Sequence, residues 1–238
     1  MRDEFFGDIN DYHKYGLLRV LTHKGEFRTG VCWMRRRDEG LAGCYLNKPG
    51  RWRKYDHELY ETLRRVLTVK RNIRQAERLE FLPRKKFLFF GDDISDDNVE
   101  RERYFDRMLE KFHDVKLIFF DPDNGLEIKS LPRGRKGSSK YLYRDEVCRT
   151  FRKGKSVLIY QQFPPKPRKP FIAQKQKAVK TCTGAAKMYA FRTSRVVFFL
   201  AVQPKHREYF QRRIEELERS CWHAEKQIVV CRDEGQRR

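Results

Sequence analysis

Short apolar runs alternate with longer segments of helical periodicity along most of the chain. The clearest run, from Leu117 to Phe120, stops at Asp121–Gly125, where proline cannot donate to a strand ladder and glycine tolerates a positive φ angle. Such a run is typical of a buried strand in a mostly parallel sheet. Further strands are predicted within residues 27–34, 85–97, 156–162, 195–202 and 227–231. Helices are predicted within residues 8–25, 57–69, 98–113, 141–151, 171–182 and 206–221.

The alternation of strands and helices predicts the fold class. Strands that are separated by helical segments are typical of α/β proteins with a mainly parallel sheet. No long linker rich in Gly, Ser or Pro divides the 238 residues, and no internal repeat is evident. We therefore expect a single Rossmann-like three-layer α/β domain that spans residues 1–238.

Polar loops follow four of the predicted strands. These loops are Gly91–Asp93, Asp121–Gly125, Gln161–Pro164 and Gln203–His206. If the four strands run parallel, the loops meet at one edge of the sheet, which is where open α/β sheets bind ligands. The sequence therefore predicts a site that combines carboxylates and amides.

The side chains that are expected to work in this site fall into two groups. The expected catalytic residues are Asp121, Asp123 and Asn124. The expected substrate-binding residues are Asp8, Asn10, Asp92, Asp93, Glu127, Tyr160, Gln161, Gln162 and His206. Acidic and amide groups in a cleft can orient water or hold the polar edge of a base.

The chain is strongly basic. It contains 54 Lys and Arg residues against 33 Asp and Glu residues, which gives a formal net charge of +21. A folded body with this charge repels itself, and the expected partner is a polyanion, in the first place DNA. Contacts with the nucleic-acid backbone are expected from Lys14, Arg51, Arg53, Lys54, Arg133, Arg135, Lys136, Ser138, Ser139, Lys140, Lys166, Arg168 and Lys169. The loop over residues 130–140 has a second interpretation as a solvated loop.

The rest of the composition narrows the class of protein. No apolar window reaches the roughly 20 residues of a membrane span, and the N-terminus lacks the pattern of a signal peptide. A cytoplasmic protein without a membrane partner is expected, and no protein partner is inferred. The six cysteines form no CxxC pair, so structural zinc and disulfides are not expected.

The N-terminal sequence FGDINDYHKYGLLRVL resembles the opening of the bacterial 23S rRNA adenine-N6 methyltransferase family, with Lys14 and Tyr15 as the Lys–aromatic pair. The catalytic loop of that family has the form Asp-Pro-x-Tyr, and Asp121–Asn124 stands in its place. The resemblance implies S-adenosylmethionine as the cofactor. Two positions differ from the family. Asn124 replaces the aromatic residue, and the first strand leads into Met34–Arg37 and not into a Gly-x-Gly turn.

The same loop resembles the first motif of the uracil-DNA glycosylase superfamily, which reads Asp-Pro-Tyr-His-Gly. Asp121, Pro122 and Gly125 match this motif in register. The resemblance implies that Asp121 orients or activates a water molecule. It also pairs the late His-Pro-Ser loop of the superfamily with Gln203–His206.

The chemistry available to these residues favours hydrolysis of an N-glycosidic bond. One carboxylate can stabilise positive charge on the sugar and orient water, while amides hold the extruded base. We expect a cofactor-independent DNA glycosylase that acts on a flipped, modified or unmodified base and leaves an abasic site, in defence against foreign DNA. No metal site is expected for this reaction.

Three alternatives remain open at the level of the sequence. The first is a methyltransferase that uses S-adenosylmethionine to modify adenine in RNA or DNA. The second is a nuclease that holds Mg²⁺ with acids of the loops, with Glu127 and Lys129 in an E-x-K pattern. The third is a nucleic-acid-binding protein without catalytic activity.

Overall fold

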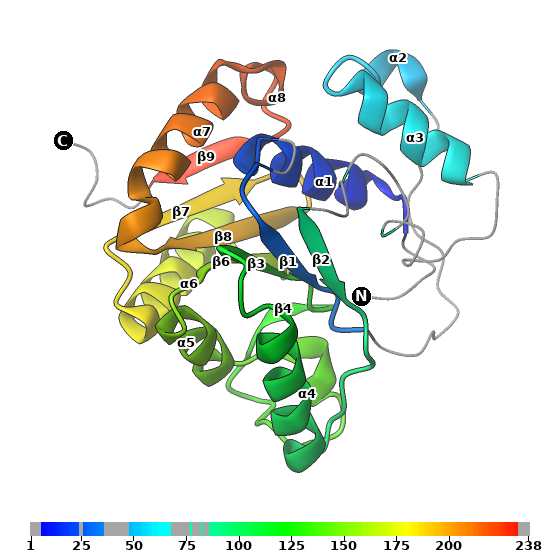
Figure 1. The fold of residues 1–238 in the computed structure, drawn as a ribbon. Helices are drawn as coiled ribbons and strands as arrows, with labels where there is room; N and C mark the ends of the chain where they lie inside the picture. The colour runs from blue at the N-terminus through cyan, green and yellow to red at the C-terminus, as the bar shows by residue number, and fades with distance from the viewer. Residues whose placement is uncertain are drawn as a thin grey trace.

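The computed structural model describes residues 6–23, 26–35, 48–67, 77, 82 and 86–232 (Figure 1). The helices and strands follow one another in the order α1 (Ile9–Leu21), β1 (Thr29–Cys32), α2 (Pro49–Trp52), α3 (His57–Leu67), β2 (Phe87–Phe90), α4 (Asn98–Lys111), β3 (Leu117–Phe120), β4 (Gly125–Leu126), η3 (Ser138–Lys140), β5 (Tyr141–Leu142), α5 (Arg144–Arg152), β6 (Ser156–Gln162), α6 (Arg168–Thr183), β7 (Lys187–Arg192), β8 (Val196–Val202), η4 (Pro204–His206), α7 (Arg207–Arg219), α8 (Cys221–Ala224) and β9 (Val229–Arg232).

A seven-stranded sheet forms the centre of the molecule, with the strand order β2-β1-β3-β6-β8-β7-β9. The strands β2, β1, β3 and β6 are parallel to one another, and β8 runs antiparallel between β6 and β7. The short strands β4 and β5 pair separately. The expected α/β class with a mainly parallel sheet is confirmed.

Helices cover both faces of the sheet (Figure 1). In β3, Leu117 and Phe119 face the core beneath α1, α3 and α7, while Ile118 and Phe120 face the core above α4, α5 and α6. All four side chains are fully buried, as the unbroken apolar run predicts for a strand covered on both sides. Each such side chain stabilises the fold by roughly 1.5–3 kcal/mol. The predicted three-layer arrangement is therefore confirmed.

Gly16 shows why a helix-weakening residue stands inside α1. A Cβ atom on this residue would lie 2.7 Å from Cζ2 of Trp222, which packs directly against the helix backbone. The loss of helix propensity, about 1 kcal/mol relative to alanine, is therefore offset by close packing of α1 on α8.

The prediction for the C-terminal half of the sheet was wrong in one respect. The strand β7 was not expected, because Met188 and Ala190 lack the branched side chains that mark a strand. A three-residue turn, 193–195, joins β7 to β8, and Thr193 Oγ1 accepts hydrogen bonds from the amides of Arg195 and Val196 at 3.2 and 3.1 Å. A turn this short forces the two strands to be antiparallel.

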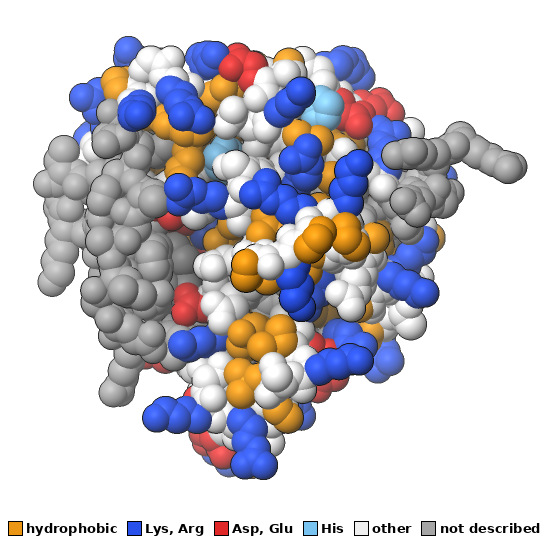
Figure 2. All heavy atoms as spheres, turned by 180° about the vertical axis from the view of Figure 1, so that it is seen from behind, with side chains coloured by type: hydrophobic (Ala, Val, Ile, Leu, Met, Phe, Trp, Pro, Cys, Tyr) orange, Lys and Arg blue, Asp and Glu red, His pale blue; other side chains and the backbone are white. Residues whose placement is uncertain are grey.

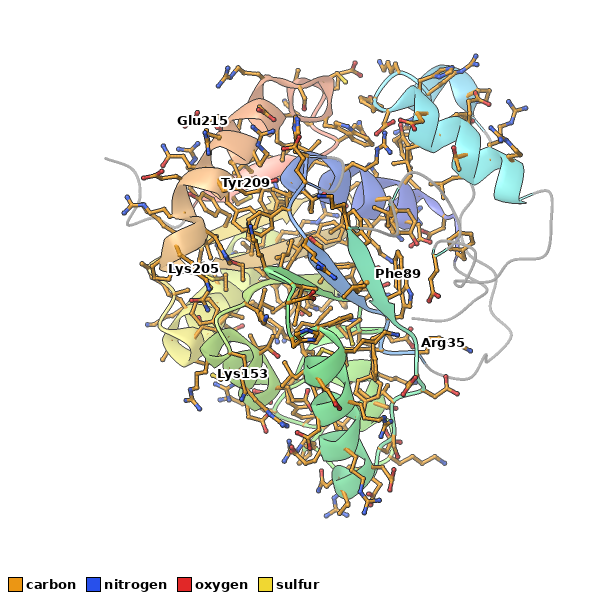
Figure 3. All side chains as sticks on the ribbon, viewed as in Figure 1. Arg35, Phe89, Lys153, Lys205, Tyr209 and Glu215 are labelled. Carbon is orange, nitrogen blue, oxygen red and sulfur yellow. The ribbon has the colours of Figure 1, made fainter. Side chains whose placement is uncertain are left out.

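Because β8 is reversed, the loop after it lies at the opposite end of the sheet from the loop after β3. Figure 3 shows this separation: Arg35, just beyond β1, and Lys205, just beyond β8, lie on opposite sides of the molecule. The expectation that Gln203–His206 joins the other three loops is therefore wrong. His206 instead lies at the start of β6, where its Nδ1 atom is 2.9 Å from Ser156 Oγ.

Smaller differences concern the ends of elements. Residues 141–142 form β5, and the helix expected from residue 141 begins at Arg144. The helix α6 begins at Arg168, before the expected residue 171. The expected helix stop at Gly25 and the expected frayed tail at residues 233–238 lie outside the described residues.

Two expectations from composition can be compared with the structure. Within the described ranges, no helix has the length and apolar character needed to cross a membrane. The described cysteines Cys32, Cys148, Cys182, Cys221 and Cys231 are free thiols, and Cys44 lies outside the described residues.

Candidate active site

The N-terminus of α1 brings carboxylates to the end of β3. Asp8 is the N-cap, and its Oδ1 atom accepts a hydrogen bond from the amide of Asp11 at 2.8 Å. Asn10 supports the cap, because its Nδ2 atom donates to Asp8 Oδ2 at 3.0 Å. Asp11 accepts a bond from the amide of Gly7 at 2.8 Å. The first turn of α1 is therefore ordered around two acidic side chains, which its helix dipole favours.

Lys14 links this helix to the loop after β3. Its Nζ atom lies 2.7 Å from Asp11 Oδ1 and 2.7 Å from Asp121 Oδ2. Lys14 is 2% exposed and the two acids are 1% exposed. The two carboxylates raise the pKa of Lys14 above its ordinary value, although burial alone would lower it. The expectation that Lys14 contacts a phosphate is wrong, because its ammonium group is buried and paired with the two carboxylates.

Burial sets the protonation of the carboxylates in this network. Burial and the charge of Asp11 raise the pKa of Asp8 to about 7. Burial also raises the pKa of Asp121, against the opposing effect of Lys14. A carboxyl group that titrates near neutral pH can act as a general acid or base, and shifted groups of this kind concentrate at functional sites.

Two buried tyrosines enclose the ammonium group of Lys14. Its Nζ atom lies 5.3 Å from the ring centroid of Tyr160 and 5.8 Å from that of Tyr15. Burial and the neighbouring carboxylates raise the pKa of both tyrosines well above the ordinary value, so both keep their proton. The network of Asp8, Asp11, Lys14, Tyr15, Asp121 and Tyr160 is called the Lys14 network below.

The loop Asp121–Gly125 is held by the end of β6. Gly125 has a φ angle of +109°, and a Cβ atom there would lie 2.4 Å from the Gln161 side chain. Gln161 Oε1 accepts a bond from the Leu126 amide at 2.8 Å, and its Nε2 atom donates to the Asn124 carbonyl at 2.9 Å. Gln161 thus braces the loop with its amide, and its side chain also lines the cleft described next, so its expected contact with a base stays a prediction.

A cleft of about 190 Å³ opens beside this loop. Its wall contains the aromatic rings of Tyr141, Phe163 and Phe171 together with the amides of Asn124 and Gln162. Gln162 Nε2 donates to the Asp123 carbonyl at 2.9 Å. Asn124 is half-buried, and the described residues provide no hydrogen-bond partner for its side-chain amide. This Asn124 cleft has the apolar walls and the few polar groups of a ligand site.

The predicted acidic residues at the other loops have basic partners. Asp92 pairs with Arg107 at 3.3 Å and Asp93 with Arg35 at 3.7 Å, and Glu127 contacts Arg144. In the part of the chain that the structure describes, no three His, Cys, Asp or Glu side chains come close enough to hold a metal ion. The acids proposed for a Mg²⁺-dependent nuclease are therefore not gathered into one group.

The basic loop over residues 130–140 is built around an internal acid. Asp96 accepts bonds from the amides of Gly137 and Ser139 at 2.7 and 2.6 Å and lies 3.2 Å from Ser138 Oγ. Both serines are buried, so the expectation that they contact phosphates is wrong. Arg133 is likewise engaged, because its Nη1 atom lies 2.7 Å from Glu102 and 2.8 Å from Asp145.

Most of the other predicted phosphate contacts lie at the surface. Arg53 pairs with Glu61 and Lys54 with Glu225, while Lys140 is half-buried. Figure 2 shows Lys and Arg side chains scattered over the described part of one face of the molecule. The exposed residues of the predicted set are Arg51, Arg53, Lys54, Arg135, Lys136, Lys166, Arg168 and Lys169.

Asp11 is the residue of the Lys14 network that the sequence did not single out, whereas Tyr15 was named there only as part of the Lys–aromatic pair. The available signal for Asp11 is its spacing from Lys14, because the two residues are three positions apart and share one side of a helix. No protein-family model matches the chain, and no curated protein is similar to it at a significant level.

His13, next to the network, gives a prediction about pH. Its side chain is 2% exposed, and burial lowers its pKa from 6.5 to about 4. The unfolded chain therefore binds more protons between these values, and stability should fall as pH drops from 6.5 to 4. His13→Phe lacks this group, so its stability should fall by less than that of the wild type over this pH range, by a difference on the order of 3 kcal/mol. Urea unfolding of the wild type and of His13→Phe, at roughly pH 7, 5.5 and 4.5, measures the difference in stability across this pH range.

The comparison of the wild type with His13→Phe separates the effect of His13 on the pH dependence of stability from the effects of other titratable groups. His206 also has a pKa lowered to about 4, and Asp8 acts in the opposite direction, but both are present in each protein. A difference in stability that does not change with pH would show that His13 takes up its proton in the folded state.

Proposed function

We propose that this protein is an S-adenosylmethionine-dependent methyltransferase that modifies an amino group of a nucleic-acid base. The observation that carries the proposal is the 2.7 Å contact between Lys14 Nζ and Asp121 Oδ2. These residues are 107 positions apart, and each belongs to one of the two segments that resemble the adenine-N6 methyltransferase family. The two segments that resemble uracil-DNA glycosylases lie at opposite ends of the sheet.

The position of the loop supports the same proposal. The chain crosses from β2 at one side of β1 to β3 at its other side, so the order of strands reverses between β1 and β3. Ligands of open α/β sheets bind outside the carboxyl ends of the strands at such a point. Asp121 follows β3 there, and its amide donates to the Cys32 carbonyl at 3.0 Å at the end of β1.

The Lys14 network can orient and deprotonate an amino group. Asp121 is 1% exposed, so the loop Asp121–Gly125 must shift when the base enters. The Asp121 carboxylate then accepts a hydrogen bond from the amino group, and Lys14 is the positioning residue that fixes this carboxylate. The amino nitrogen loses a proton when it gains a methyl group. Asp8 accepts this proton, because its pKa of about 7 makes it an effective base near neutral pH.

The chemistry of the carboxylates after β2 fits the cofactor. Asp92 and Asp93 follow the strand next to β1 and are about half exposed, and their surface ion pairs are weak. Carboxylates at this position suit the ribose hydroxyls of an adenosyl group. S-adenosylmethionine supplies a methyl group on a positively charged sulfur. Residues 36–47 lie outside the described residues.

A basic surface and an aromatic cleft support a nucleic-acid substrate. The net charge of +21 attracts a polyanion, and the Asn124 cleft begins three residues after Asp121. Aromatic walls can stack on a base that has left its helix, and amides can bind the edge of that base. Asn124, which stands where the methyltransferase family has an aromatic residue, supplies one of these amides.

Asp121→Asn tests the proposal through activity. The substitution keeps the shape of the side chain but removes the charge that orients the amino group, so the rate of methyl transfer should fall on the order of 100-fold or more. Transfer of a labelled methyl group to single-stranded DNA and RNA measures this rate. Glu110→Gln, an exposed change on α4, is the matched control and should keep the full rate.

Two outcomes would contradict the proposal. One is full methyl transfer by Asp121→Asn under conditions where the control is also active. The other is a wild-type protein that transfers no label to any of these nucleic acids and gives no heat on titration with S-adenosylmethionine.

Base hydrolysis is the second candidate, and one observation favours it. A carboxylate with the pKa of Asp8, about 7, can remove a proton from water at neutral pH. This candidate predicts abasic sites, seen as strand breaks after heating in alkali, in the presence of EDTA and without S-adenosylmethionine. Intact strands under these conditions would count against it.

A further inference from the structure

The chain forms a proline-rich rim beside the Asn124 cleft. Residues 163–168 leave β6 and enter α6, with prolines at positions 164, 165 and 167. The amide of Lys166 donates to the Pro164 carbonyl at 2.7 Å, which closes a tight turn. This rim, together with Ser194 and Arg195 from the β7–β8 turn, forms an open groove that is called the rim groove below.

The rim groove and the Asn124 cleft adjoin each other. Phe163 and Pro164 line both hollows, so a strand that places a base in the cleft can pass over this shared wall into the groove. Phe163 is held in place from both sides: its ring centroid lies 6.0 Å from that of Phe171 and 5.0 Å from the guanidinium carbon of Arg168. The shared wall is therefore an ordered aromatic surface.

The groove is positive. Lys166, Arg168 and Arg195 contribute exposed side chains to its lining, and none of the described Asp and Glu residues lines it. The first turn of α6 contains no acidic residue, so the positive end of this long helix is not neutralised there. Arg168 Nη2 donates to the Ser194 carbonyl at 2.7 Å, which holds the guanidinium group over the groove. Such a surface binds phosphate groups.

We propose that these two hollows bind an unpaired strand of nucleic acid, with one base in the Asn124 cleft and its neighbouring phosphates in the rim groove. This inference rests on the proposed function and names its substrate as single-stranded. A volume of about 190 Å³ takes one planar base and not a base pair. Aromatic walls next to a cationic groove are the usual means of holding single strands. A paired base would first have to leave its stack.

The experiment measures binding and not catalysis. Fluorescence anisotropy follows a labelled oligonucleotide in single-stranded DNA, single-stranded RNA and duplex DNA forms of one sequence, at several salt concentrations and without a methyl donor. We expect the full-length protein to bind one or both single strands at least on the order of 10-fold more tightly than the duplex. The comparison of DNA with RNA identifies which strand is preferred.

The variants locate the strand. Lys166→Ala/Arg168→Ala should weaken single-strand binding about 10-fold and lower the salt slope by about 0.7 for each lost phosphate contact. Lys111→Ala/Lys153→Ala, a change of two exposed lysines away from the groove, is the matched control for charge and should keep the affinity. If loss of the Arg168–Ser194 bond lowers stability, Lys166→Ala/Arg195→Ala, at two positions that line the groove, carries the same test. Asn124→Leu should weaken the single-strand complex and leave the duplex complex unchanged.

Two results would overturn the inference: equal affinity for duplex and single strand, or equal weakening by the groove variant and its control. Neither result depends on methyl transfer. Single-strand preference without methyl transfer would contradict the proposed function alone, and methyl transfer to duplex DNA without this preference would contradict the inference alone.

Discussion

Lys14→Met should lower the free energy of unfolding by about 3–5 kcal/mol, because it leaves the buried carboxylates of Asp11 and Asp121 without their ammonium partner. Methionine has a similar length, so the change removes charge more than volume. Urea unfolding at pH 8 measures the loss. At lower pH the loss should be smaller, because unpaired buried carboxylates have a raised pKa and can take up protons.

Two comparisons make this result specific to the ion pair. Lys153→Met, at an exposed position labelled in Figure 3, should change stability by less than about 0.5 kcal/mol. Lys14→Met/Asp121→Asn should recover part of the stability, since one uncompensated charge is removed, yet it should stay inactive in methyl transfer. If Lys14→Met and Lys153→Met are equally stable, Lys14 is not buried between the two acids.

Arg101→Met should have an effect of similar size, about 3–5 kcal/mol, on the other side of the sheet. Arg101 on α4 is fully buried and forms an ion pair with Glu146 on α5. Its Nη2 atom also donates to the Tyr141 carbonyl at 2.6 Å, which ties it to β5. Tyr141 lines the Asn124 cleft, so the variant should also weaken binding of single-stranded nucleic acid.

Chemical unfolding and oligonucleotide binding measure the two effects of Arg101→Met. Arg103→Met on the same helix is the control, because Arg103 is 64% exposed and its ion pair with Glu100 lies at the surface. Arg101→Met/Glu146→Leu should regain stability, since it removes the unpaired carboxylate. A single variant as stable as this control would show that the Arg101–Glu146 pair does not support the fold.

The strand ends after β2, β3 and β6 could be predicted from the sequence because their signals are local. An apolar run that stops at Asp121-Pro122 fixes a buried strand and a polar loop without any knowledge of the rest of the chain. The cap at Asp8 and the helix after it could be predicted for the same reason. These elements set the edge of the sheet where Asp121, Tyr160 and Asn124 lie.

The contacts between distant segments could not be predicted in this way. Nothing near Lys14 indicates that a carboxylate 107 residues away will neutralise it, and its charge alone suggested a phosphate contact. Ser138 and Ser139 gave a similar signal, but Asp96 fills the anion site that their loop forms. The misplacement of His206 followed from one unrecognised strand, β7, which reverses the direction of β8.

Mass spectrometry of single-stranded DNA and RNA, after incubation with the protein and S-adenosylmethionine, tests the central claim most directly. It distinguishes an added methyl group, a released base and a cut backbone in one measurement. The proposed function predicts added methyl groups on intact strands, which disappear when Asp121→Asn replaces the wild-type protein. Released bases or cut strands in the absence of the cofactor, with no methyl group added, would contradict it.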